Sequence, residues 1–190
     1  MGGYVTLSAS GNFPVPYRLG SIPSGDAGVA ATLKIMVNMV LQCRADPVAR
    51  VTAQALVKDC PSRDSVCQVA ALHAFVRDHI KYLPDVRDVE TIQTPAYTLE
   101  MGSGDCDDHS VLLACLCEAI GKQTRFLAVG IRGEGFSHVS SQVLLGTRWV
   151  NLETIVPTLK EPWGQLPAGA PTPIGWFPPD ATRFMPARVP

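Results

Sequence analysis

The stretch from Gly102 to Ser110 combines a thiol, carboxylates and an imidazole, which are residue types suited to nucleophilic or metal chemistry. Its two glycines allow a tight turn, after which Asp105 is a good helix N-cap and Cys106 becomes the first helical residue. A thiol at a helix start meets unpaired backbone N–H groups and the positive end of the helix dipole, and both favour the thiolate. Cys106 is therefore a candidate nucleophile, although a free cysteine is also a common small core residue.

Two segments further along the chain predict a β-hairpin that supplies a base and an acid. Residues 135–145 and 148–153 have the composition of strands, and Gly146-Thr147 between them can form a tight turn. Side chains alternate between the two faces of a strand. The register set by this turn makes His138 and Glu153 diagonal neighbours on one face, within reach of each other. A slip of one residue would separate them.

These three residues predict a catalytic triad. His138 would take the proton of the Cys106 thiol, while Glu153 would accept from the other ring nitrogen and hold the ring in place. The thiolate would attack an amide carbonyl and form a thioester, which water would hydrolyse or another amine would convert to a new amide. The pattern thus predicts acyl transfer through a thiol, by a thiol protease, amidohydrolase or transamidase that acts on a peptide or protein and needs no cofactor.

The same residues resemble the transglutaminase-like superfamily. The resemblance rests on the segment 104–110, on a strand carrying His138, and on Trp149-x-x-Leu152-Glu153, and it covers roughly residues 70–157. Residues 93–99 are similar to stand-alone bacterial and phage members. The resemblance implies a papain-like core and, for small microbial members, hydrolysis rather than transamidation. The family usually has Asp where this chain has Glu153, so the reach of this carboxylate differs.

Capping residues and helical periodicity indicate an α+β fold around this core, with N-terminal helices packed on a small antiparallel sheet. Proline and glycine breaks predict an irregular segment over residues 81–104. Residues 124–131 form an apolar run typical of a central strand. The helices are expected at residues 26–43, 46–59, 64–80 and 106–120.

The chain divides into a transglutaminase-like domain, residues 26–156, and two flanking arms. Residues 1–25 predict an extended N-terminal arm or a short edge strand, and residues 157–190 hold nine prolines and form a Pro-rich C-terminal arm. The C-terminal arm either wraps on its own domain or docks on other subunits. The apolar 26–43 helix is either central or shared with a partner. The aromatic anchors of the C-terminal arm would be Trp163, Trp176 and Phe177.

Composition limits the remaining possibilities. A net charge of −1 gives no reason to expect nucleic acid or an anionic membrane as partner, and no apolar run is long enough for a membrane span. The protein is expected to be made in the cytoplasm. Its resemblance to phage proteins suggests incorporation in a virion as a tail component. The alternative function is that of a structural tail or baseplate assembly protein that uses the same core as a scaffold without turnover.

Other reactive side chains have simpler interpretations. Of the six cysteines, most are expected to be reduced core residues, while Cys60 and Cys67 could meet across a helix turn. Consecutive helical residues fan out around the axis, so around Cys106 only His109 could share its face, and no metal is expected. His73 lies on an apolar helical stripe, which predicts a buried, hydrogen-bonded histidine rather than a catalyst.

Overall fold

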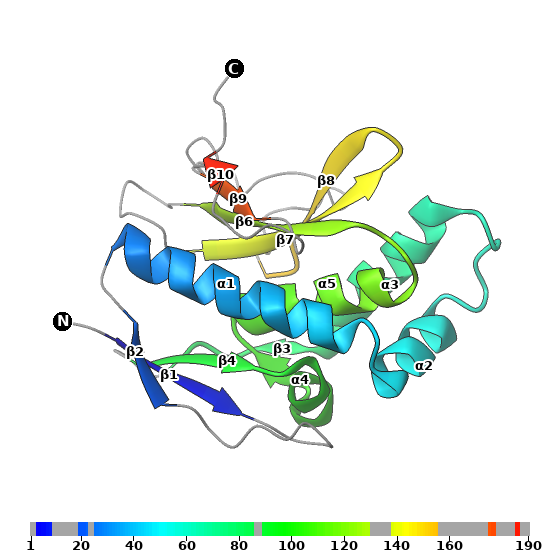
Figure 1. The fold of residues 1–190 in the computed structure, drawn as a ribbon. Coiled ribbons are helices and arrows are strands. Elements are labelled where there is room, and N and C mark those ends of the chain that lie inside the picture. Colours follow the sequence, from blue (N-terminus) through cyan, green and yellow to red (C-terminus); the bar gives the residue numbers. More distant parts are fainter. Residues whose placement is uncertain are drawn as a thin grey trace.

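A five-stranded antiparallel sheet and a three-stranded sheet lie on opposite sides of a layer of helices in the computed structural model of this chain (Figure 1). This arrangement confirms the expected α+β fold. The structure describes residues 3–8, 19–22, 25–85, 89–129, 138–155, 175–177 and 185–186. The helices are α1 (Asp26–Cys43), α2 (Pro47–Leu56), α3 (Ser65–His79), α4 (Pro95–Met101) and α5 (Cys106–Ala119). The strands are β1 (Gly3–Ser8), β2 (Leu19–Ile22), β3 (Lys81–Tyr82), β4 (Val89–Gln93), β5 (Ser103–Gly104), β6 (Thr124–Val129), β7 (His138–Leu145), β8 (Arg148–Leu152), β9 (Gly175–Phe177) and β10 (Met185–Pro186).

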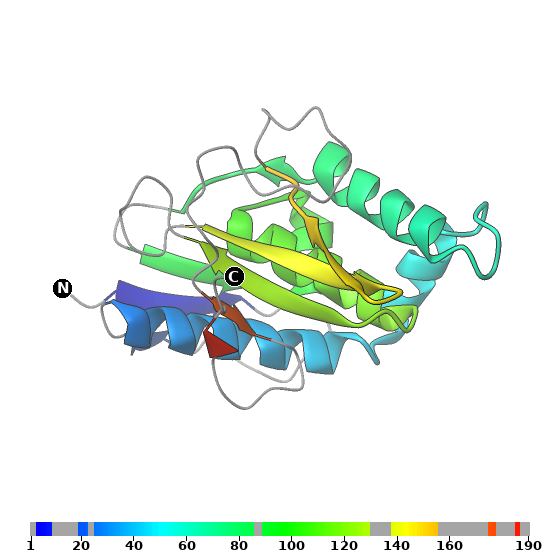
Figure 2. The same ribbon diagram turned by 90° about the horizontal axis from the view of Figure 1, so that it is seen from above.

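Helix α5 is the centre of the fold. Every residue from Asp107 to Cys117 is buried, so this helix has no solvent face. One apolar cluster joins it to α1, β4 and β6, and a second joins it to α2, α3, β7 and β8. Figure 2 shows β6 and β7 lying across it. The residue that opens α5 is therefore held from several sides.

Helix α1 packs against α5 through a buried stripe. Its side chains Leu33, Met36, Val37 and Val40 are at most 3% exposed, as expected of a central helix. Although α1 is apolar, no helix in the described part of the chain is both long and apolar enough to span a bilayer.

The segment 81–104, expected to be irregular, contains four short elements among its described residues. Strands β3 and β5 form a parallel pair, and β4 pairs with β1. Pro95 and Gly102 mark the ends of a helix here: Thr94 caps α4, Pro95 is its first residue, and Gly102 ends it at φ 61°. The expectation was wrong because elements this short depend on tertiary partners.

The ends of the chain add strands to both sheets. Strand β1 is the central strand of the three-stranded sheet rather than an edge, since it pairs with β2 and with β4. Strand β9 pairs with β6, with Trp176 opposite Leu127, so this part of the Pro-rich arm lies on its own domain. Trp163 and the predicted strand residues 130–131 and 135–137 lie outside the described residues.

Four cysteines form disulfides, which corrects the expectation that most are reduced. Cys60 and Cys67 pair across the start of α3, the one approach that the sequence suggested. Cys43 pairs with Cys115 although 72 residues separate them, because the end of α1 lies against α5. Among the described residues, Cys106 and Cys117 remain as free thiols.

Candidate active site

Cys106 opens α5 directly beside a capping box. Asp105 Oδ1 accepts hydrogen bonds from the Asp107 and Asp108 N–H groups at 2.9 and 3.3 Å, and Asp108 Oδ2 accepts from the Asp105 N–H at 3.2 Å. Asp108 Oδ1 accepts from the Gln93 N–H at 2.6 Å, which ties the helix start to the end of β4. Burial, with Asp105 nearby, raises the pKa of Asp108 to about 7. These contacts fix where the helix begins and hence where the thiol lies.

The backbone at Gly104 passes too close to Asp108 for any side chain to fit. A Cβ on Gly104 would lie 2.5 Å from Asp108 Cβ and 2.7 Å from Asp108 Oδ2. The carbonyl of Gly104 also accepts from the Leu83 N–H at 2.9 Å, within the β3–β5 pair. The glycine before the capping box is therefore needed for close approach rather than for an unusual φ.

Replacing Gly104 by alanine is expected to lower the free energy of unfolding by up to about 3 kcal/mol, because the added methyl overpacks a buried contact. Urea denaturation measures the loss. Gly146→Ala is the control: no atom lies within 4 Å of its added Cβ, but its φ is 62°, so only the backbone strain of about 1 kcal/mol is expected. Equal losses in the two variants would contradict the steric explanation.

His138 and Glu153 meet across the β7–β8 hairpin. Leu145 pairs with Arg148 across the turn, which is the register expected from the sequence, and the pairing continues to Ser141 and Leu152. The imidazole nitrogen His138 Nε2 lies 2.6 Å from Glu153 Oε2, and the two side chains are 7% and 4% exposed. The longer carboxylate of Glu153 thus reaches the ring.

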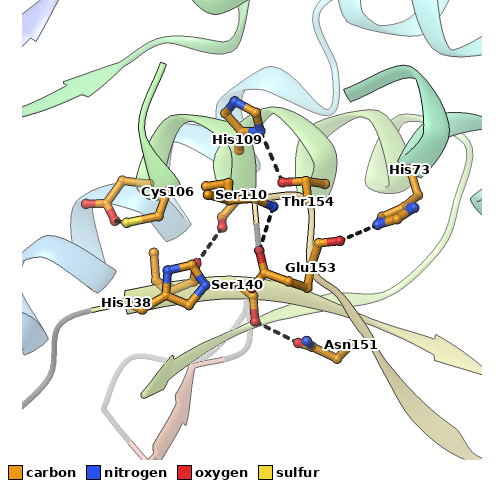
Figure 3. Close-up of polar contacts among 12 residues, drawn as sticks. His73, Cys106, His109, Ser110, His138, Ser140, Asn151, Glu153 and Thr154 are labelled. Carbon is orange, nitrogen blue, oxygen red and sulfur yellow. Dashed lines mark hydrogen bonds and ion pairs between the residues drawn. The ribbon is translucent and has the colours of Figure 1, made fainter. Parts of the chain in front are cut away.

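The helix that carries the thiol is joined to the strand that carries the imidazole. One turn after Cys106, Ser110 Oγ donates to the Val139 carbonyl at 3.2 Å. The Cys106 thiol itself lies beside the N–H of Val139, the residue that follows His138. Figure 3 shows Cys106 at the start of α5 and His138 at the start of β7, facing the same region. The structure therefore brings the three predicted site residues, Cys106, His138 and Glu153, to one place.

The resting state of Cys106 is the thiol. Burial raises the pKa of Cys106 well above its usual value, and the carboxylates of Asp107 and Asp105 raise it further, while the Val139 N–H acts in the opposite direction. The thiol lies 3.5 Å from Asp107 Oδ1, to which it donates. The helix start by itself favours the thiolate, but burial and two nearby carboxylates outweigh the helix dipole. The opposing charge of Asp107 follows from the sequence, whereas the burial does not.

Replacing Asp107 by asparagine is expected to speed alkylation of Cys106 about tenfold near neutral pH, because removing a neighbouring negative charge lowers the thiol pKa by roughly one unit. Iodoacetamide labelling at several pH values, with the modified peptide quantified by mass spectrometry, measures the rate. In the wild type and the variant, the alkylation rate should rise with pH, and the midpoint of this rise should lie at lower pH in the variant. Asp78→Asn, on the exposed side of α3, is the matched control. An unchanged rate in Asp107→Asn would show that this carboxylate does not govern the thiol.

Two further histidines contact the segment that carries the acid. His73 Nε2 lies 2.6 Å from the Glu153 carbonyl oxygen, and His109 Nδ1 lies 3.1 Å from Thr154 Oγ1 (Figure 3). Both rings are buried, and burial lowers the pKa of each, so both are neutral near pH 7. The prediction of a buried, hydrogen-bonded His73 is confirmed. Its partner could not be identified from the sequence, because 80 residues separate the two.

One group of potential metal ligands occurs among the described residues. Ligand atoms of Asp105, Cys106 and Asp107 lie within 4.8 Å of one another, rather than those of Cys106 and His109 as the helical spacing suggested. Asp105 Oδ1 already accepts two backbone hydrogen bonds as the helix cap. This group is accounted for by the helix start, and we assign no metal to it.

Comparison with known proteins relates this site to a family. Residues 52–154, more than half of the chain, match the sequence profile of the Transglutaminase-like superfamily. No curated protein sequence matches the chain significantly.

Solved structures show the same fold at low sequence identity. Calcium-bound LapG from Legionella pneumophila superposes with a TM-score of 0.57 at 14% identity, over 80% of this chain and 88% of LapG. A candidate protease from Parabacteroides distasonis gives a TM-score of 0.55 at 13% identity, over all of this chain but 41% of that protein. A candidate cysteine protease from Cytophaga hutchinsonii matches at 15% identity and a TM-score of 0.46, over 55% of this chain and 36% of its own. The chain therefore spans less than half the length of two of these relatives.

Proposed function

This chain belongs to the transglutaminase-like superfamily, and on that premise we propose that it is a cysteine peptidase or amidohydrolase that cleaves amide bonds through a thioester on Cys106. The observation that carries this proposal is the 2.6 Å contact between His138 and Glu153, on a hairpin joined to the helix that Cys106 opens. A nucleophile, a base and an acid that orients the base are the parts that acyl transfer by a thiol needs. The candidate protease from Parabacteroides distasonis supports the same reaction class.

The geometry supports one order of proton transfers. Since His138 Nε2 donates to Glu153, its Nδ1 is the nitrogen left to take the Cys106 proton. The sulfur then bonds to the amide carbonyl carbon, and the backbone N–H of Cys106, in the first turn of the helix, stabilises the oxyanion. The C–N bond breaks as His138 returns its proton to the leaving amine. Water, deprotonated by His138, hydrolyses the thioester, and the thiol regains its proton.

The elevated pKa of Cys106 has a mechanistic consequence. Because the resting site holds a neutral thiol, the thiolate forms only as His138 becomes charged, and Glu153 stabilises that charge. We expect turnover to depend on all three residues together rather than on a pre-formed thiolate.

A peptide library tests the proposed function. The full-length protein is incubated with an equimolar peptide mixture, new termini are identified by mass spectrometry, and acid-quenched protein is mapped for an acyl adduct. Cleavage together with an adduct on Cys106 is expected, and prior alkylation of Cys106 should abolish both. Cleavage that continues after alkylation of Cys106 would contradict the thioester mechanism.

The scaffold alternative and the phage virion remain separate proposals. A virion component that uses the core without turnover would assemble equally well with Cys106→Ala, and loss of Cys106 would leave its biological output unchanged. We also propose that protein partners bind through the N-terminal strands, α1 and the Pro-rich arm.

The two disulfides indicate in which kind of compartment the protein acts. Structural disulfides persist in oxidising environments, and this chain pairs Cys43 with Cys115 and Cys60 with Cys67. We therefore propose that the protein, made in the cytoplasm, acts outside that reducing compartment.

A further inference from the structure

Glu153 is held at three separate atoms. His73 Nε2 lies 2.6 Å from its backbone carbonyl oxygen, the Ile155 N–H donates to Oε1 at 2.8 Å, and His138 Nε2 lies 2.6 Å from Oε2. The contact to Ile155 closes a local turn, whereas the contact to His73 comes from a helix far away in the chain. Figure 3 shows Glu153 between His138 and His73.

The position of His73 is itself fixed by packing. His73 is 3% exposed on α3, and its neighbours Leu72 and Val76 belong to the apolar cluster that also contains Leu152, the residue before Glu153. A carbonyl oxygen only accepts hydrogen bonds, so His73 Nε2 must carry the proton and donate it. The burial that lowers the pKa of His73 keeps this ring neutral, so it brings no charge that would compete with His138 for the carboxylate.

Glu153 needs such support more than an aspartate would. Glu has one more rotatable bond between the backbone and the carboxylate than Asp, so a free Glu153 would place its oxygens over a wider volume. Strand β8 ends at Leu152, so Glu153 lies just beyond the paired residues of the sheet. Of the contacts to Glu153 described above, His73 is the one that anchors its main chain, and the Ile155 N–H then uses one carboxylate oxygen and leaves Oε2 for the imidazole.

We propose that His73 is a positioning residue, which anchors the Glu153 backbone so that its carboxylate holds His138 in the orientation needed for proton transfer. This inference rests on the proposed function. A neighbouring contact strengthens the anchor: His109 Nδ1 lies 3.1 Å from Thr154 Oγ1, so helices α3 and α5 hold two successive residues after β8. The segment is thereby fixed to the same helix that carries Cys106.

Three variants separate positioning from simple core packing. His73→Leu removes the donor, His73→Gln keeps an N–H donor at the end of the side chain, and His79→Leu removes an exposed histidine from the same helix as a control. We expect kcat to fall on the order of 10- to 100-fold in His73→Leu with little change in KM, because misplacing a catalytic group acts on the chemical step. His73→Gln should regain most of the loss, and His79→Leu should match the wild type.

A double-mutant cycle with Glu153→Gln tests the connection between the two residues. If His73 acts through Glu153, His73→Leu in the Glu153→Gln background should cost less than about threefold. The same fractional loss in both backgrounds would overturn the proposal and leave His73 as a packing residue.

A spectroscopic readout keeps the inference testable apart from turnover. The ring N–H of His138 that donates to Glu153 should give a downfield proton resonance, which is retained in His73→Gln and broadened or lost in His73→Leu. An unchanged resonance in His73→Leu would overturn the inference even if activity fell. If no substrate were ever cleaved, the proposed function would fail, while this measurement would still decide the role of His73.

A second variant covers the case in which His73→Leu does not fold. His73→Phe keeps a ring but lacks the donor, and it then replaces the leucine variant. If neither variant folds, His73 has a purely structural role and the proposal is overturned.

Discussion

Cys106→Ala is expected to lower kcat/KM on the peptides cleaved by the wild type by on the order of 10⁴- to 10⁶-fold, the loss typical of removing a nucleophile from a catalytic triad. No other free thiol can replace it among the described residues, because Cys117 is fully buried on α5 and burial raises its pKa to about 12. Initial rates under the same conditions measure the effect. Residual turnover would come only from substrate binding and the oxyanion donors.

The matched control is Cys117→Ala, which removes the second free thiol from the same helix. It should leave kcat/KM within a few fold of the wild type, since this thiol faces the core. Thermal denaturation shows whether both variants fold. A folded Cys106→Ala variant with wild-type turnover would exclude the thioester mechanism.

Breaking the Cys43–Cys115 disulfide is expected to lower the free energy of unfolding by about 4 kcal/mol, since the bond closes a loop with a sequence separation of 72 residues. The Cys43→Ala/Cys115→Ala double variant should therefore lose a large share of the stability typical of a single domain. The loss acts on the site as well, because this bond joins α1 to the helix that Cys106 opens. Urea denaturation without reductant measures it.

The second disulfide is the internal control. Cys60 and Cys67 are separated by 7 residues, so removing that bond should cost only about 2 kcal/mol on the same chain-entropy argument. Thiol titration of the denatured, unreduced wild type should find the free thiols of Cys106 and Cys117. Six reactive thiols would show that neither bond forms, and equal losses in the two double variants would contradict the loop-length argument.

Local signals in the sequence determined where the helices start and which residues of the hairpin face each other. Asp46, Asp64 and Asp105 each cap the helix that follows them, because a short carboxylate at this position satisfies the free N–H groups of a first turn. The turn between β7 and β8 set the register of the hairpin, so the approach of His138 to Glu153 followed from counting residues. These features involve neighbours in the chain, which is why they could be predicted without coordinates.

The tertiary structure decided what depends on distant neighbours. It made short elements of residues 81–104, paired Cys43 with Cys115, and set His73 against the Glu153 backbone. It also decided the charge state of Cys106: the helix dipole and the flanking carboxylates of Asp105 and Asp107 are local properties, but the burial that raises the thiol pKa most arises only once α5 is enclosed. The sequence thus determined which side chains carry the chemistry, and the packing around α5 determined their protonation and support, because desolvation and long-range contacts exist only in the folded chain.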